Sequence, residues 1–161
     1  MNLKRIFLLL VVFCSPSLAA EKADKVLVEK AKHKLTLFNN GKVIASYHVV
    51  FGSNPVGHKE QEGDERTPEG NYTLDSKNAK SAYHKSIHIS YPNAKDIANA
   101  KKKGVSAGSA IMIHGQKNGY AAFEEQTQKF NWTLGCIALT NKDMDDLWSK
   151  INVPTKIEIK P

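Results

Sequence analysis

Two residues in the second half of the chain have side chains that could carry out nucleophilic chemistry together. Cys136 follows Gly135, and His114 ends a short apolar run and is followed by Gly115. A cysteine attacks as its thiolate, and a histidine within hydrogen-bond reach can take the thiol proton or hold the thiolate as an ion pair. This pair predicts an enzyme in which Cys136 is the nucleophile and His114 accepts and donates protons.

The backbone beside the cysteine also suits acyl transfer. Gly135 lets the chain turn tightly, and the amides around Leu134, Gly135 and Cys136 are candidate donors to an oxyanion. The histidine precedes the cysteine by 22 residues (136 − 114). Papain-like thiol hydrolases have the opposite order, so the chain order excludes that pattern.

The N-terminal segment has the pattern of a secretory signal peptide. Lys4 and Arg5 precede the apolar run 6–13, and small residues follow up to Ala19. The run is too short to span a bilayer, which takes about 20 apolar residues. We expect a signal peptide over residues 1–19 and export to the periplasm or cell envelope.

Removal of this segment would make Cys136 the one remaining cysteine. Cys14 would leave with the signal peptide; its lipidation is the alternative, although Phe13 stands where lipoprotein signals resemble a pattern with a small residue. Exported proteins normally pair their cysteines. A solitary thiol in that setting is kept for chemistry, pairs with another chain, or packs as an inert apolar group.

Composition limits the possible partners. The chain has 161 residues, 41% of them hydrophobic, and a formal charge of +7, which becomes +5 without Lys4 and Arg5. This charge favours anionic surroundings such as cell wall or membrane. The lysines are scattered and no nucleic-acid motif occurs, so we expect no nucleic-acid partner. The histidines lack the spacing and carboxylate partners of a zinc site, so we expect no metal.

The hydrophobic pattern predicts a mainly β domain with short helices, of the α+β class, over residues 24–160. Strands recur without regular helical crossovers, which favours a largely antiparallel or mixed sheet. Expected strands cover 25–28, 34–38, 42–51, 71–74, 84–90, 110–113 and 156–160. Expected helices cover 94–103, with Ile97 and Ala98 facing inward, 120–130, and a segment opened by a capping box at Thr140 whose buried face is Met144, Leu147, Trp148 and Ile151.

Several motifs together resemble the YkuD-type L,D-transpeptidase catalytic domain family. His114-Gly115, then Thr133-x-Gly135-Cys136-Ile137 and Asn141, are similar to its signature. The segment 67–72, Thr-Pro-Glu-Gly-Asn-Tyr, resembles the family's Thr-Pro-x-Gly-x-aromatic run. The resemblance extends over roughly residues 25–161 and implies a β-sandwich or mixed-sheet catalytic domain.

The resemblance implies a cysteine acyltransferase of peptidoglycan biosynthesis, cell wall biogenesis and cell shape that needs no cofactor. Its thiol would form a thioester at meso-diaminopimelate of a wall stem peptide and pass it to an amine, such as another stem peptide or a lysine of an envelope lipoprotein. We expect a monomer. The residues given roles are the catalytic Cys136, His114, Gly115 through its carbonyl and Gly135 through its backbone, and the substrate-binding His88, Tyr91 and Thr133.

Two departures from the family pattern leave the second substrate open. The family often has His at the position of Leu134 and Arg at the position of Ala138. The same nucleophile could serve hydrolysis, as a carboxypeptidase or an amidase. A sortase-like enzyme is disfavoured because no arginine follows Cys136. A further alternative is a wall-binding module without catalytic activity, whose cysteine forms a disulfide dimer.

Overall fold

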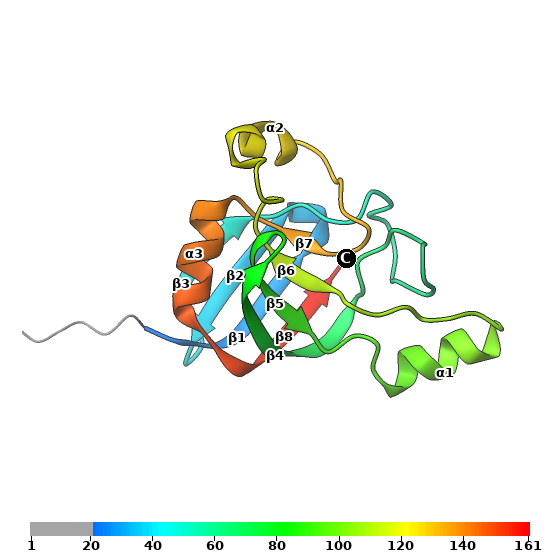
Figure 1. Ribbon diagram of the computed structural model, residues 1–161. Coiled ribbons are helices and arrows are strands. Elements are labelled where there is room, and N and C mark those ends of the chain that lie inside the picture. The colour runs from blue at the N-terminus through cyan, green and yellow to red at the C-terminus, as the bar shows by residue number, and fades with distance from the viewer. Residues whose placement is uncertain (1–20) are drawn as a thin grey trace, which may run out of the picture.

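The computed structural model describes residues 21–161, which form one curled sheet of eight strands with short helices around it (Figure 1). The strand order is β3-β2-β1-β8-β4-β5-β6-β7. The strands are β1 Ala23–Glu29, β2 Lys34–Asn39, β3 Lys42–His48, β4 Gly70–Ser81, β5 His84–Ile89, β6 Met112–His114, β7 Ile137–Ala138 and β8 Ile151–Lys160. The helices are α1 Ala94–Lys102, α2 Glu124–Thr127 and α3 Asn141–Lys150, with single 3₁₀ turns η1 Lys30–Lys32 and η2 Ala121–Phe123.

The sheet is mixed, as the sequence predicted. The pairs β1–β8 and β6–β7 are parallel and the other five are antiparallel. After β3 the chain crosses to the far edge of the sheet, where Val50 bridges Ala138 and Gly52 bridges Thr133. These bridges join the two edges, which curls the sheet and fixes the loop that precedes β7.

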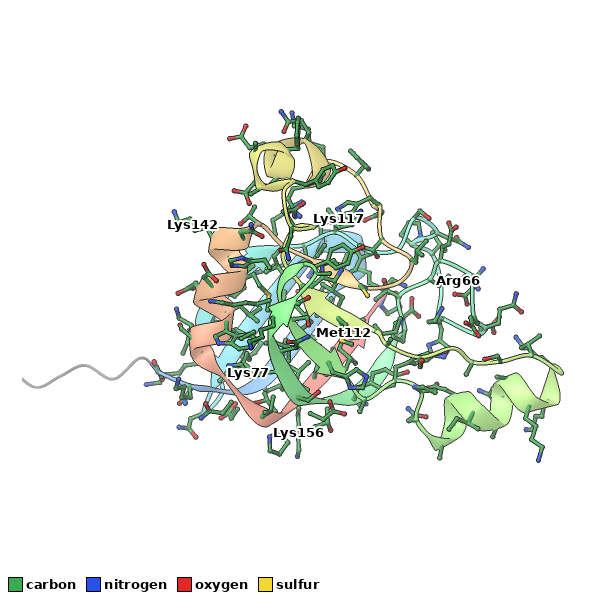
Figure 2. The ribbon with its side chains drawn as sticks, viewed as in Figure 1. Arg66, Lys77, Met112, Lys117, Lys142 and Lys156 are labelled. Carbon is green, nitrogen blue, oxygen red and sulfur yellow. The ribbon has the colours of Figure 1, made fainter. Side chains whose placement is uncertain are left out.

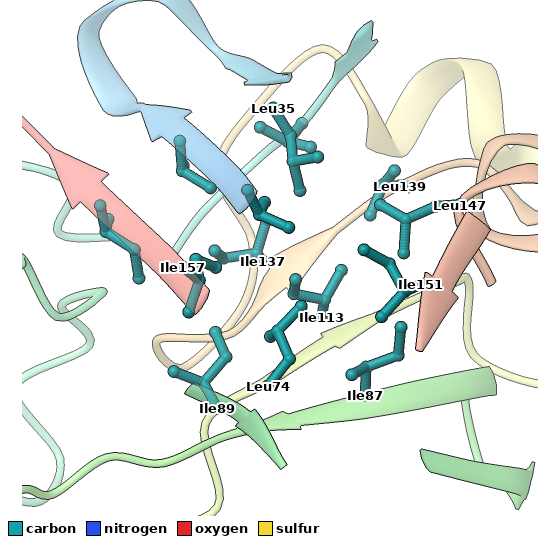
Figure 3. Close-up of a cluster of buried hydrophobic side chains, with 14 of the residues drawn as sticks. Leu35, Leu74, Ile87, Ile89, Ile113, Ile137, Leu139, Leu147, Ile151 and Ile157 are labelled. Atoms are coloured by element: carbon teal, nitrogen blue, oxygen red, sulfur yellow. The ribbon is translucent and has the colours of Figure 1, made fainter. Parts of the chain in front are cut away.

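The core lies inside this curl and is made of alternating strand residues (Figure 3). Ile157 and Ile159 of β8 are 1% and 2% exposed, whereas the alternate residues Lys156, Glu158 and Lys160 lie on the opposite face. Helix α3 adds Met144 and Leu147, both fully buried. Burial of each such aliphatic side chain contributes about 1.5–3 kcal/mol, so the core holds β5, β6 and β7 in a fixed relation.

Helix α1 corrects one prediction. Ile97 is 53% exposed and Ala98 is exposed, so neither faces inward. The buried residues are Asp96 and Ala100. The Asp96 carboxylate accepts hydrogen bonds from the Tyr72 hydroxyl at 3.0 Å and from the backbone N–H of the cap residue at 2.9 Å. The helix is therefore oriented by its buried carboxylate rather than by its apolar residues.

The segment expected to be a helix over 120–130 is mostly irregular. It contains only η2 and the four-residue α2, and neither has a buried residue. At the start of α3, the Thr140 hydroxyl accepts a hydrogen bond from the N–H of Asp143 at 3.1 Å, which is half of the predicted capping box. Strand β4 extends to Ser81 because its polar second half pairs with β5. None of the helices in residues 21–161 is long and apolar enough to cross a membrane.

Candidate active site

The parallel pairing of β6 and β7 brings the cysteine and the histidine together. Ile113 pairs with Ile137, and His114 pairs with Ala138, so Cys136 stands one residue before the paired segment. The N–H of Met112 donates to Cys136 Sγ at 3.4 Å. Cys136, His114 and Met112 line one cleft of about 990 Å³, and Figure 2 shows Met112 on β6. The sheet thus places the two residues in a single site.

The histidine ring is held in one orientation and one tautomer. His114 is 5% exposed, and its Nδ1 lies 2.7 Å from the carbonyl oxygen of Gly115. A carbonyl can only accept, so Nδ1 carries the proton and Nε2 of the neutral ring is free to accept one. Tyr83 and Trp132 enclose the ring, with centroids 4.7 Å and 5.8 Å from that of His114. This arrangement prepares Nε2 to act as a base.

Burial disfavours the charged form of both groups. It raises the pKa of the Cys136 thiol, which the Met112 N–H and the charge of Lys59 partly offset. It lowers the pKa of His114, and the hydrogen bond to Gly115 opposes that shift. Because the charged form is disfavoured at each residue, the geometry favours a neutral thiol and imidazole over a resting ion pair.

Thr133 holds the loop that carries Cys136. Its hydroxyl donates to the carbonyl of Cys136 at 2.7 Å and accepts from the N–H of Gly135 at 3.1 Å. Thr133 is 4% exposed. The N–H of Gly135 is therefore already used, whereas the backbone N–H groups of Leu134 and Cys136 donate no backbone hydrogen bond within residues 21–161. Those two amides are the available candidates for binding an oxyanion.

Gly135 is required by a close approach of two backbones. Its φ is +128°, and an added Cβ would lie 2.6 Å from the carbonyl oxygen of Arg66 and 3.2 Å from Ile111. Figure 2 shows Arg66 on the loop beside the central strands. A side chain at position 135 would displace this loop and Cys136 with it.

Asn141 braces the histidine rather than the cysteine. Its side-chain oxygen accepts from the N–H of Gln116 at 2.8 Å, and its own N–H donates to Glu124 at 2.9 Å. The Gln116 side chain, 1% exposed, donates to the carbonyl of Leu139 at 2.7 Å. An added Cβ at Gly115 would lie 2.6 Å from the Asn141 oxygen, so only glycine allows this brace.

One wall of the cleft is the loop 59–66, which a buried ion pair shapes. Lys59, 2% exposed, donates to the Asp64 carboxylate at 2.8 Å. That carboxylate also accepts the N–H groups of Glu60, Gln61 and Arg66. Burial raises the pKa of Asp64, but the hydrogen bonds from Lys59 and these amides outweigh it and hold the value at about 2. Asp64 is therefore an anion that organises the wall.

The sequence that forms this cleft matches a known protein family. A family model described as the YkuD L,D-transpeptidase catalytic domain matches residues 23–159. The chain belongs to the YkuD family. The matched range contains the resembling segments 67–72, 114–115 and 133–141. Thr67 is fully buried, and its hydroxyl accepts from the N–H of Gly52, which bridges Thr133 of the cysteine loop.

Several known proteins are similar to this YkuD domain. YafK of Escherichia coli strain K12 is 31% identical over 108 residues, which are 66% of this chain and 36% of YafK. The helical cell shape determining protein Pgp2 of Campylobacter jejuni superposes with a TM-score of 0.65 at 25% identity, covering 88% of this chain and 49% of Pgp2. Bd1075 of Bdellovibrio bacteriovorus gives 0.58 at 24% identity, covering 90% and 50%. The chain thus spans about a third to a half of these relatives.

Two residues expected to bind substrate lie outside the cleft. His88 contacts Asp75 through Nδ1 at 2.7 Å and is absent from the cleft lining. Tyr91 is 2% exposed, and its hydroxyl donates to the carbonyl of Ala107 at 2.9 Å. Tyr91 is therefore part of the core. Thr133 lines the cleft, but its hydroxyl is used by the cysteine loop.

Leu134 and Ala138, the two residues that depart from the family pattern, lie in different surroundings. Leu134 is 76% exposed and lines the cleft mouth, where it can contact a substrate directly. Ala138 is fully buried between β6 and Val50. An arginine at position 138 would bring a charged group into this packed position, so the small residue suits the closed edge of the sheet.

The structure adds cleft residues that the sequence did not reveal. Tyr83, Ser86 and Lys59 line the cleft but lie in segments with no motif. Tyr83 follows the turn after β4, and Ser86 pairs with His114 across β5 and β6. Alternation along β5 indicates that Ser86 shares a face with His88, but it does not indicate which neighbouring strand carries the histidine.

Proposed function

We propose that this domain transfers an acyl group of a peptidoglycan stem peptide through a thioester on Cys136. The donor is a tetrapeptide stem, and the reacting carbonyl belongs to meso-diaminopimelate at its third position. The supporting observation is the pairing of β6 with β7, which places Cys136 and His114 in one cleft with His114 Nδ1 committed to Gly115. Membership of the YkuD family supports the same chemistry.

The first half of the reaction forms the thioester. His114 Nε2 takes the thiol proton as Cys136 Sγ attacks the carbonyl carbon, and the carbonyl oxygen becomes an oxyanion. The N–H groups of Leu134 and Cys136 stabilise that oxyanion. The imidazolium then gives its proton to the nitrogen of the terminal D-alanine, the C–N bond breaks, and D-alanine leaves.

The second half transfers the acyl group to an amine. The acceptor is the amine of another stem peptide, a free D-amino acid or a lysine of an envelope lipoprotein. It loses a proton to His114 Nε2 as it attacks the thioester, the C–S bond breaks, and the imidazolium returns the proton to Cys136 Sγ to restore the thiol. Water attacking by the same route would make the enzyme a carboxypeptidase or amidase. Leu134, exposed at the cleft mouth, is placed to influence which acceptor enters.

The test is product analysis by mass spectrometry. The protein is incubated with purified disaccharide-tetrapeptide and with crosslinked wall, and we expect loss of D-alanine together with new amide-linked products. Cys136→Ala and His114→Ala should each abolish turnover while circular dichroism shows a folded protein. His88→Ala is the matched control, because His88 lies outside the cleft and should leave turnover intact. Turnover by Cys136→Ala would reject the proposal, and release of D-alanine with no transfer product would assign the reaction to hydrolysis.

The proposal extends to where the domain works. The signal peptide predicted over residues 1–19 lies outside the described residues, and we propose that it directs the catalytic domain, residues 24–160, to the periplasm or cell envelope as a monomer. The relative Pgp2 is named as a cell shape determinant, and we propose that this domain also acts in cell wall biogenesis and cell shape. Detection of the protein in a periplasmic extract, and its retention in the cytoplasm after deletion of residues 2–19, would test the location.

A further inference from the structure

The exposed aromatic side chains of the described chain lie in one segment. Tyr120, Phe123 and Phe130 are 52%, 55% and 55% exposed, and no other aromatic residue of the 21–161 range is as exposed. All three belong to residues 117–131, the segment that carries η2 and α2 and stands out from the sheet at the top of Figure 1. Exposed apolar groups gathered in this way mark a binding surface more often than a structural one.

This segment is fixed to the active site although it has no core of its own. Thr127 donates to the side-chain oxygen of Gln116 at 2.7 Å, and Asn131 accepts from the N–H of Phe51 at 2.9 Å. Glu124 accepts from the N–H of Asn141, the residue that braces the histidine loop. The chain from His114 to Cys136 passes through this segment, so these contacts fix its backbone against the elements that carry both residues.

Chain geometry places Phe130 within reach of the glycan strand to which a stem peptide is attached. Phe130 is two residues from Trp132, which lines the cleft, so their Cα atoms are at most about 7 Å apart. A stem peptide bound with its third residue at Cys136 extends only about 10 Å before it meets the sugar that carries it. The glycan strand of a bound substrate therefore passes over the surface near the cleft mouth.

The charge of the segment favours a neutral partner. Residues 117–131 contain two lysines, Lys117 and Lys129, and two glutamates, Glu124 and Glu125, so their formal charges cancel. The chain as a whole carries +7. A surface for anionic lipid or an acidic protein would carry an excess of lysine, which this segment does not have. Flat aromatic faces, which are electron-rich, suit instead the polarised C–H groups on the face of a sugar ring.

We propose that Tyr120, Phe123 and Phe130 form an aromatic platform that binds amino-sugar rings of the glycan strand carrying the donor stem peptide. The inference rests on the proposed function, because it assumes that the stem peptide enters the cleft. Tyr120 and Phe123 stand with their ring centroids 6.3 Å apart and form the outer part of the platform. Phe130 forms the part nearest the cleft.

The platform is tested by binding, apart from turnover. The probe is glycan strands stripped of their stem peptides, titrated into Cys136→Ala protein by isothermal calorimetry. We expect Phe130→Ala to weaken binding about five- to tenfold, the effect of one aromatic stacking contact. Phe130→Tyr should keep the affinity because it keeps the ring, and Ile97→Ala, at an exposed apolar residue of α1, should leave it unchanged.

A second readout separates this inference from the proposed function. In protein with the native thiol, Phe130→Ala should lower kcat/KM for disaccharide-tetrapeptide about five- to tenfold and leave kcat/KM for the free tetrapeptide unchanged. No turnover of either substrate by the unsubstituted protein would count against the proposed function. Turnover with the same ratio of the two values in both proteins would overturn the platform alone. Concentration-dependent dimerisation that Phe130→Ala removes would assign the surface to self-association and also overturn the platform.

Discussion

Replacement of Thr133 by valine tests whether this residue holds the cysteine loop or contacts the substrate. The side chains have nearly the same shape, so the change removes the hydroxyl with little loss of packing. Two partners lose their hydrogen bonds: the carbonyl of Cys136 at 2.7 Å and the N–H of Gly135 at 3.1 Å. Each buried group left unpaired costs about 1–3 kcal/mol, so the loss of two hydrogen bonds should lower the free energy of unfolding by about 2–6 kcal/mol. For a domain of this size the melting temperature should fall by about 8–24 °C.

The same change should lower kcat more than it raises KM. The loop that carries the thiol and the oxyanion donors would lose its fixed geometry, and misplacement by about 1 Å can cost about 100-fold in rate. Thr133→Ser keeps the hydroxyl and serves as the control, with near-normal stability and kcat. Melting by circular dichroism and steady-state kinetics on the tetrapeptide measure both effects. If Thr133→Val raised KM with kcat and the melting temperature unchanged, Thr133 would be a substrate contact and the loop argument would be wrong.

Three further predictions follow from single contacts. Gly115→Ala should reduce kcat at least tenfold, since its Cβ would displace the Asn141 oxygen. The control is Gly41→Ala, which should leave kcat unchanged because no atom lies within 4 Å of its Cβ. Equal effects on kcat would contradict the role of Asn141 in holding the histidine loop. Folding lowers the pKa of Asp64 from 3.8 to about 2, so Asp64→Asn should lower the free energy of unfolding by about 2 kcal/mol at pH values above 3.8. The difference between the two proteins should shrink as the pH falls through 2, because Asp64 then becomes protonated. Urea denaturation measures this, and a difference that does not change with pH would contradict it. Because the pKa of His114 is lowered, the acid limb of kcat/KM should lie below pH 6.5, and a limb at or above 6.5 would contradict burial of a neutral ring.

Local sequence patterns predicted the sheet well where one face of a strand is buried. The alternation in β8 and the spacing of Met144 and Leu147 in α3 report burial directly, so these elements were placed correctly. In β2 and β5 the sheet also buries Thr36 and Ser86, which the alternation places on the outward face. The same logic failed for α1, because Ile97 is exposed and a buried aspartate orients the helix. A polar residue that caps its own helix from inside the protein leaves no hydrophobic pattern.

Long-range pairing could not be derived from the sequence. The parallel β6–β7 contact and the bridge from Val50 to Ala138 join segments far apart in the chain, and together they make the site. Cys136 and His114 were predicted because their chemistry is distinctive. His88 and Tyr91 were predicted to bind substrate, but local sequence did not show that His88 contacts Asp75 outside the cleft lining, or that Tyr91 is buried with its hydroxyl on the Ala107 carbonyl.

Intact-protein mass spectrometry during turnover would detect a covalent intermediate on Cys136. The protein is mixed with tetrapeptide, quenched in acid within the first turnovers, and digested to locate any adduct. We expect a mass increase equal to the stem peptide without its terminal D-alanine, carried on Cys136 as a thioester that hydroxylamine removes. D-alanine released with no adduct on Cys136, or with an adduct on a different residue, would contradict nucleophilic catalysis by this thiol.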